Sequence, residues 1–185
     1  IRKGLAGKDT INIQGITEAM KEIRIEFVYN PDSGEYETYL NSENVEKEIR
    51  GLDVSAHVSA IGKISEVRTR LVHLQRQMGT DKGIVMDGRD IGTTVFPDAD
   101  LKIFMTAPVD IRAKRRYEEL KSKGIDVSLE EIRSNIITRD ITDENRDISP
   151  LRRADDAVIL DNSRMSIPGQ MEWVRKLIKE KLNDR

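Results

Sequence analysis

The sequence predicts an α/β protein built on an open parallel sheet, with an antiparallel hairpin in its first half. In the second half, short apolar runs alternate with helical patterns of about 12 to 17 residues, which is typical of parallel strands joined by crossover helices. These runs cover 84–86, 101–105 and 157–160. In the first half, apolar residues alternate over 23–29, turn-forming residues cover 30–34, and a second alternating run follows at 36–40, which indicates two antiparallel strands.

Apolar periodicity predicts the helices that accompany these strands. Apolar residues recur at three- and four-residue spacing over 64–78, with Ser65 available as a cap. After the second apolar run, a helix is expected to start near Pro108, which suits a first turn, and to stop before Gly124.

Two more helices complete the predicted second half. Ser128 and Glu131 form a capping-box pattern at the start of one helix. The last helix is expected from about Ser166, where apolar residues again follow one stripe.

Composition and charge exclude several classes of protein. A chain of 185 residues is long enough for one domain with a buried core. With 31 Lys and Arg against 33 Asp and Glu, the net charge of −2 gives no electrostatic reason to expect nucleic-acid or membrane-surface binding. The absence of cysteine and the presence of only two histidines disfavour a thiolate zinc site and a Ser-His-Asp triad. We expect a cytosolic monomer that works with carboxylates and guanidinium groups.

Charged residues follow the first apolar run, where a ligand site is expected. In open parallel sheets, ligands bind beyond the carboxyl ends of the strands. The loop after 84–86 begins Asp87-Gly88-Arg89-Asp90. An arginine there can grip a phosphate with two N–H groups, and a carboxylate can hold a metal-bound water or accept from an exocyclic amine. The alternative interpretation is a charged turn that pairs with itself.

A second group of charges lies in the helix that begins near Ser128. Arg139, Asp143 and Arg146 share one helical face if the helix continues that far. Two guanidinium groups beside a carboxylate suit a phosphorylated sugar. An ordinary solvated ladder of salt bridges is the alternative.

The helix after the second apolar run carries a dense basic patch. Its members are Arg112, Lys114, Arg115 and Arg116. Several arginines on a helix–loop–helix suit a mobile lid that covers a phosphate, because the charge on a transferring phosphoryl group must be met by cations. A solvated face is the alternative, and an RNA-binding surface is disfavoured by the near-neutral charge.

Taken together, these motifs closely resemble those of bacterial cytidylate kinases. The resemblance rests on the motif DGRDIGT at 87–93, the Arg-rich helix, and the motif RDITDENR at 139–146. It implies a P-loop nucleoside-monophosphate kinase that moves the γ-phosphoryl group of ATP, with Mg²⁺, onto CMP or dCMP. It also implies a single kinase domain over 1–185, with an antiparallel monophosphate-binding insert at about 22–63 and a helical lid at about 112–127.

The resemblance assigns substrate roles residue by residue. Ser59, Arg68 and Asp90 correspond to cytosine readers, Arg89 and Arg146 to clamps on the CMP phosphate, and Asp143 to the ribose acceptor. The assignment of Asp90 makes physical sense, since a carboxylate rewards the N4 amine of cytosine and faces the O4 of uracil unfavourably.

The resemblance also assigns residues to the donor side of the reaction. Arg112 and Arg116 correspond to lid arginines near the transition-state charge, and Arg115 to a contact with ATP. Arg139 is expected near the ribose and the transferring phosphate. Asp87 corresponds to a residue that contacts Mg²⁺ indirectly, through the groups bound to the ion.

The sequence lacks the family's N-terminal strand, P-loop and first helix. The stretch from Gly4 to Thr10 does not supply the P-loop, because only two residues separate its glycines and Asp9 follows Lys8. Loss of a central strand would expose backbone edges of the sheet. We therefore expect either a further segment before Ile1 or an inactive truncated kinase, and a non-catalytic nucleotide-binding module is the alternative function.

Overall fold

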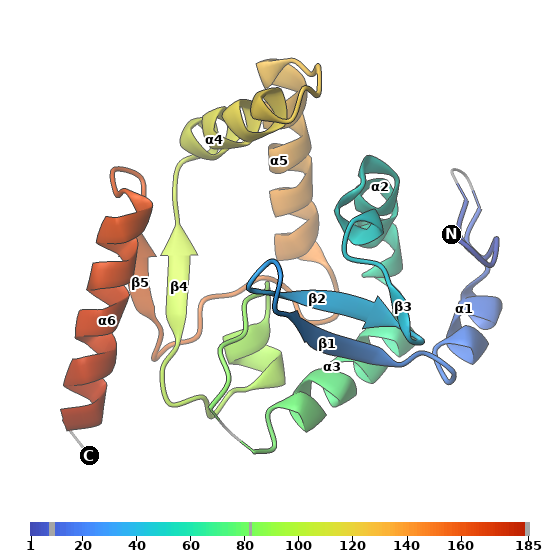
Figure 1. Cartoon of the computed structure of the whole chain (residues 1–185), viewed down its shortest axis with the longest axis horizontal. Coiled ribbons are helices and arrows are strands. Elements are labelled where there is room, and N and C mark those ends of the chain that lie inside the picture. Colours follow the sequence, from blue (N-terminus) through green and yellow to red (C-terminus); the bar gives the residue numbers. More distant parts are fainter. Residues whose placement is uncertain (8–9, 82, 184–185) are drawn as a thin grey trace. The chain divides into compact units, whose positions relative to one another are not determined.

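A computed structural model of the chain describes residues 1–7, 10–81 and 83–183. The side chains of 52, 53, 55, 56, 59 and 182 lie outside this description. The chain forms two compact units, Ile1–Asp81 and Lys82–Arg185 (Figure 1). That the two units act as one kinase domain stays a prediction.

The first unit contains the predicted antiparallel hairpin. After helix α1 (Ile13–Ala19) come strands β1 (Ile25–Asn30), β2 (Glu35–Leu40) and β3 (Glu43–Asn44). β1 pairs with β2 from Ile25 opposite Leu40 to Asn30 opposite Glu35, and β2 pairs with β3. The turn closes because Gly34 adopts a positive φ of 71°, which favours glycine. The hairpin prediction is confirmed.

Helices complete the first unit and supply its core. They are the 3₁₀ turn η1 (Glu48–Arg50), α2 (Leu52–Ile61) and α3 (Ser65–Met78). Ile16, Met20, Ile64 and Val67 form a buried cluster between α1 and α3. The predicted helix over 64–78 is confirmed, but Ser65 as its cap is wrong. The extended N-cap residue is Ile64, so the Ser65 hydroxyl lies inside the first turn, where it bonds Glu66 at 2.8 Å.

The second unit contains the parallel strand pair. β4 (Ile103–Thr106) and β5 (Val158–Asp161) pair in parallel, from Ile103 beside Val158 to Thr106 beside Asp161. Their arrows run in the same direction in Figure 1. The connection between them is made by α4 (Val109–Ser122) and α5 (Leu129–Asn145), and α6 (Ile167–Asn183) follows β5. The α/β class and two of the three predicted parallel strands are therefore confirmed.

The third predicted strand, over 84–86, is wrong. This run belongs to no strand, and Val85 is fully exposed. An apolar run becomes a strand only when a neighbouring strand supplies its ladder of hydrogen bonds. Among the described residues no strand pairs with this run.

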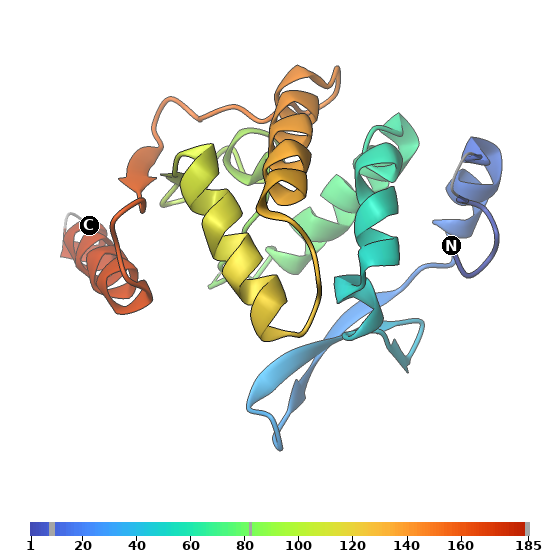
Figure 2. The ribbon, with the colours of Figure 1, turned by 90° about the horizontal axis from the view of Figure 1, so that it is seen from above.

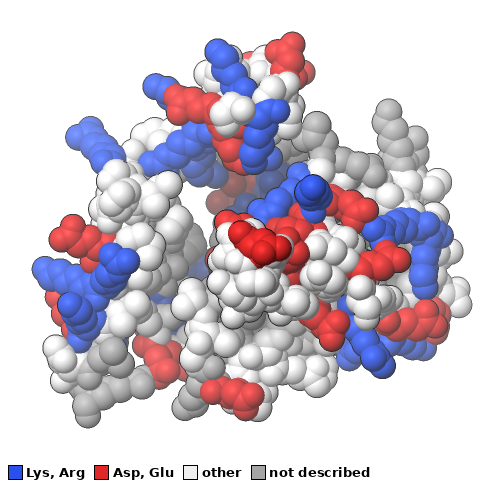
Figure 3. Space-filling view, viewed as in Figure 1, with Lys and Arg blue, Asp and Glu red and all other residues white. Residues whose placement is uncertain are grey.

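Helices α4 and α5 form a helical hairpin with its own small core. Ala113, Leu120 and Ile132 are buried between the two helices, which lie side by side in Figure 2. The structure confirms the predicted stop before Gly124 and the capping box of Ser128 with Glu131. Basic and acidic side chains are intermixed over the hairpin, at the top of Figure 3. No helix of the described residues is long and apolar enough to cross a membrane.

Lys102 ties the loop before β4 to the loop before β5. Its ammonium group donates to the carbonyl oxygen of Pro97 and to both carboxylate oxygens of Asp156, at 2.9 and 2.8 Å. These hydrogen bonds hold the pKa of the Asp156 carboxyl below its usual 3.8. A charge-assisted contact thus fixes the start of the parallel pair.

This contact predicts a pH dependence of stability. Because the pKa of Asp156 is lowered in the folded state, its contribution is present above pH 3.8 and is lost as the pH falls through the lowered folded pKa. We expect Asp156→Asn to lower Tm at neutral pH and the difference from the unmodified protein to vanish in strong acid. Thermal melts across this pH range test it, with the exposed neighbour Asp155→Asn as control. An equal Tm difference at every pH would contradict the assignment.

Candidate active site

The DGRD segment leads into a helical turn in the stretch of chain that precedes β4. The π-helical turn η2 (Ile91–Val95) begins directly after Asp90, whose carbonyl oxygen accepts from the backbone N–H groups of Thr94 and Val95. A Cβ at Gly88 would come within 2.9 Å of the Ile91 side chain, so a larger residue there would require that side chain to shift. π-helical turns are frequent at functional sites. The turn buries the Asp90 side chain.

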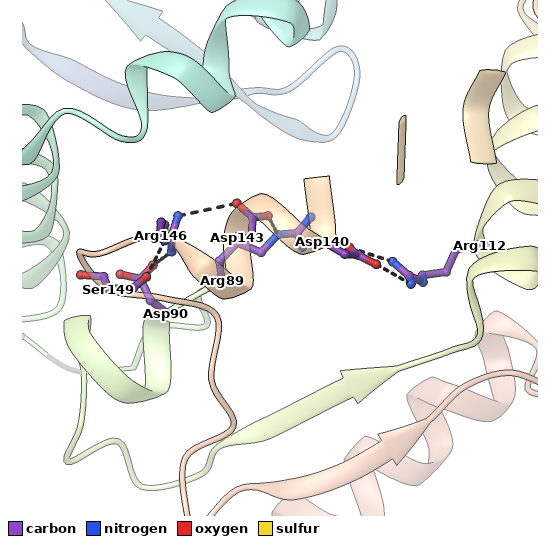
Figure 4. Close-up of polar contacts among 7 residues, drawn as sticks. All are labelled: Arg89, Asp90, Arg112, Asp140, Asp143, Arg146 and Ser149. Carbon is purple, nitrogen blue, oxygen red and sulfur yellow. Dashed lines mark hydrogen bonds and ion pairs between the residues drawn. The ribbon is translucent and has the colours of Figure 1, made fainter. Parts of the chain in front are cut away.

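A row of alternating arginines and aspartates joins this turn to α5 (Figure 4). Arg89 donates from Nε to Asp143 Oδ2 at 2.8 Å. The other Asp143 oxygen lies 3.7 Å from Arg146 Nη1, and Arg146 Nη2 lies 3.7 Å from Asp90 Oδ1. The side chains of Asp90 and Arg146 are each 9% exposed, whereas Arg89 is 48% exposed. The two arginines that were predicted as phosphate clamps therefore meet at one carboxylate.

Arg146 joins the row from outside the helix. α5 ends at Asn145, and Arg146 is its extended C-cap, with φ −69° and ψ 144°. Its guanidinium turns back because Nε donates to the carbonyl oxygen of Ser149 at 2.6 Å. Ser149 has a φ of +51°, which is uncommon for a residue other than glycine. The predicted helical face that would include Arg146 is thus wrong, although Arg146 and Asp143 do come together.

Arg112 is anchored between α4 and α5. Its Nη1 and Nη2 donate to the two oxygens of Asp140 at 3.1 and 2.7 Å. Its Nε donates to the carbonyl oxygen of Ala107 at 2.9 Å. Ala107 directly follows β4, so this guanidinium lies at the carboxyl end of the strand pair, where ligands of parallel sheets bind.

The other two lid arginines contact different partners. Arg115 donates to the side-chain and backbone oxygens of Asn162, at 3.0 and 2.6 Å, in the loop that follows β5. Arg116 donates to Glu119 at 2.7 Å, one turn along α4. Hydrogen bonds from Lys123 and Arg116 lower the pKa of the Glu119 carboxyl. Arg116, Glu119 and Lys123 together form a salt-bridge ladder that is typical of a helix surface.

Two predicted site residues, Arg139 and Asp87, are exposed. Neither of their side chains makes a hydrogen bond or ion pair with another described residue. No group of three or more potential metal ligands occurs in the described part of the chain. Asp87 is a single exposed carboxylate, and Mg²⁺ usually keeps several waters beside one or two carboxylates, so the remaining ligands of an ion at Asp87 would have to be water and substrate phosphates.

The remaining predicted cytosine readers belong to the first unit. Arg68 is partly buried in α3. The backbone of Ser59 lies in α2, but its side chain is outside the described residues.

The structure adds residues that sequence reasoning missed. Asp140 and Asn162 each bind a predicted lid arginine, and the Ser149 carbonyl orients Arg146. The spacing of Asp140 and Asp143 on one face of a helix was an available signal for Asp140. The contact of Asn162 depends on tertiary structure and that of Ser149 on backbone geometry, so no local sequence pattern predicts them.

Comparisons with known proteins identify the family of this chain. The cytidylate kinase family model matches residues 5–180. A cytidylate kinase of Bacteroides thetaiotaomicron is 52% identical over 184 residues, which is 97% of this chain and 80% of that protein. Cytidylate kinases of Phocaeicola vulgatus and Flavobacterium johnsoniae are each 50% identical, over 99% and 94% of this chain and 80% and 76% of their own length. The chain therefore belongs to the cytidylate kinase family, and it is a nucleotide-binding phosphotransferase.

Proposed function

We propose that this protein transfers the γ-phosphoryl group of ATP to CMP or dCMP, giving CDP or dCDP in pyrimidine nucleotide metabolism. Family membership supports the reaction class. The observation that carries the proposal is the row of Arg89, Asp143, Arg146 and Asp90, because it offers guanidinium groups for a phosphate beside carboxylates for a sugar and a base. The proposed fold is that of a P-loop nucleoside-monophosphate kinase, with the insert at 22–63 and the lid at 112–127.

The phosphate of CMP is bound by Arg89 and Arg146 in this proposal. Arg89 uses only Nε on Asp143, so its terminal N–H groups remain for phosphate oxygens. Arg146 is fixed by Ser149 and flanked by two carboxylates, which keep its side chain in place before substrate arrives. Preformed cations of this kind bind a dianion without first having to be ordered.

The nucleoside of CMP is read by carboxylates. Asp143 has acceptor capacity beyond its contacts with the two arginines, since a carboxylate offers about four lone-pair sites, and it accepts from ribose hydroxyls. Asp90 accepts from the N4 amine of cytosine. Ser59 and Arg68, which the family resemblance assigns to base recognition, are the further candidates for reading cytosine.

The donor phosphates are met by the arginines of the helical hairpin. Arg112, Arg116 and Arg139 face the transferring phosphoryl group, and Arg115 contacts ATP. A phosphate oxygen of CMP attacks the γ-phosphorus while the bond to the β-phosphate bridging oxygen breaks, so ADP leaves and no covalent enzyme intermediate forms. Catalysis then consists of positioning and charge neutralisation. Asp87 would hold a water molecule of the Mg²⁺ ion. When bound, the ion would neutralise negative charge on the phosphates of ATP.

A direct assay tests the proposed function. The purified protein is incubated with ATP and Mg²⁺ and with CMP, dCMP or UMP, and diphosphate formation is measured. We expect efficient transfer to CMP and dCMP and poor transfer to UMP. Binding of CMP without transfer to any of the three would contradict the kinase proposal and favour a nucleotide-binding module.

A further inference from the structure

The strongest unassigned feature of the second unit is the carboxylate that holds Arg112. Asp140 receives two hydrogen bonds from the terminal nitrogens of this arginine, at 3.1 and 2.7 Å, in a two-pronged arrangement. The third bond of the guanidinium, from Nε to Ala107, lies at the end of β4. Three points of attachment fix the plane of the group as well as its position.

The anchored guanidinium still has donors to offer. Arginine carries five N–H groups, and the three hydrogen bonds to Asp140 and Ala107 leave two of them. Arg112 is 36% exposed and Asp140 is 25% exposed, so the remaining donors can reach a ligand while the carboxylate is largely covered. A cation fixed in this way needs no reorganisation when charge develops on a phosphoryl group.

We propose that Asp140 is a positioning residue for phosphoryl transfer, which holds the Arg112 guanidinium at the carboxyl end of β4 with two N–H groups directed to the transferring phosphoryl group. This inference rests on the proposed function. Both oxygens of Asp140 accept from Arg112, so the proposed role of Asp140 is to hold that arginine and not to bind substrate. Its effect on the reaction passes through that arginine.

A second ion pair on the same two helices provides the matched control. Arg133 of α5 donates to Asp110 of α4 at 2.8 Å, and this contact raises the pKa of Arg133. Both pairs join α4 to α5, but the Asp110 side chain is 77% exposed, and among the described residues neither side chain of this pair forms a hydrogen bond or ion pair with β4 or β5. If the Asp140 pair served helix packing alone, loss of either pair would have similar consequences.

The experiment compares Asp140→Asn with Asp110→Asn in steady-state kinetics and in NMR of the arginine Nε–H groups. For Asp140→Asn we expect kcat to fall by on the order of tenfold to a hundredfold, the range that misplacement of a catalytic group by about 1 Å produces. The KM for CMP should stay within about twofold, since Arg112 does not bind CMP in this scheme. The Arg112 Nε–H signal should broaden or shift in this variant alone. Asp110→Asn should leave kcat and that signal unchanged.

A double-mutant cycle tests whether Asp140 acts through Arg112. We expect Asp140→Asn to add no further loss of kcat once Arg112→Lys is present, because residues that act as a unit are not additive. Asp140→Glu, which keeps the carboxylate, should recover part of the lost rate. A full and independent loss in the Arg112→Lys background, or equal effects of Asp140→Asn and Asp110→Asn, would overturn the proposal.

The NMR arm separates this inference from the proposed function. If the unmodified protein transfers no phosphoryl group, the kinase proposal fails, but the Arg112 signal can still be titrated with inorganic pyrophosphate. A response in the unmodified protein and in Asp110→Asn that is lost in Asp140→Asn would support the positioning role. An Arg112 signal that does not change on addition of pyrophosphate, or that changes equally in all three proteins, would overturn the positioning role of Asp140.

Discussion

Replacing Arg146 by alanine is expected to lower kcat/KM for CMP, dCMP and UMP alike, by on the order of 10²- to 10³-fold, as loss of a charge-stabilising donor does in other active sites. The loss should be uniform because the proposed partner of Arg146 is the phosphate, which the three substrates share. The structure gives a second reason for a large effect. Arg146 lies between Asp90 and Asp143, so its removal leaves two carboxylates beside each other without their common cation.

The same substitution should also lower stability. Asp90 and Arg146 are each only 9% exposed at their side chains, and removing one partner of a buried pair typically costs about 3–5 kcal/mol. Urea unfolding measures this loss, and kinetics must be taken at temperatures where the variant is folded. Arg152→Ala, an exposed arginine a few residues further along, serves as the control and should change neither quantity. A preference of Arg146→Ala for one base over another would contradict the phosphate assignment.

The second large effect is expected from Asp90→Asn, which should reduce the preference for CMP over UMP by about tenfold to a hundredfold, the equivalent of one unmatched buried polar contact. An asparagine offers an N–H donor to the O4 of uracil as well as an acceptor to the N4 amine of cytosine. The ratio of kcat/KM for the two substrates is the decisive measurement.

The structure refines the expectation for Asp90. Because Asp90 also lies 3.7 Å from Arg146, its neutralisation should weaken the binding of every monophosphate to a smaller, base-independent extent. Asp98→Asn, which neutralises an exposed carboxylate in the same loop, controls for the change in net charge. An unchanged ratio of CMP to UMP would remove Asp90 from base recognition, whatever happened to overall affinity.

The elements that sequence predicts well are those that local forces define. The hairpin at β1 and β2 has a strict alternation and a turn, and the capping box at Ser128 has both of its partners within four residues. The run at 84–86 has the composition of a strand, but it is not one in the structure because a ladder needs a neighbour. The amino-acid composition of a segment indicates whether it can be buried, but it does not identify the strand with which the segment pairs.

The candidate site shows the same division. The DGRD motif identifies Arg89 and Asp90, and the spacing within α5 brings Asp143 toward them. The spacing of Asp140 from Asp143 places both on one helical face, but the contact of Asp140 with Arg112, 28 residues earlier, depends on tertiary structure. The reversal of Arg146 depends on a positive φ at Ser149, a backbone state that side-chain periodicity does not encode.

The pairing of arginines with aspartates in the second unit affects how its candidate site binds anions. Three arginines, Arg89, Arg112 and Arg146, are matched by Asp143, Asp140 and Asp90, so the site carries its own counterions. An arginine cluster without carboxylates would attract dissolved anions and release them when the nucleotide binds. The affinity for the nucleotide would then depend steeply on ionic strength. Here an incoming anion competes with tethered carboxylates instead. A whole nucleotide adds sugar and base contacts to its phosphate contacts, so it competes with the tethered carboxylates more effectively than sulfate or free phosphate, which bring charge alone.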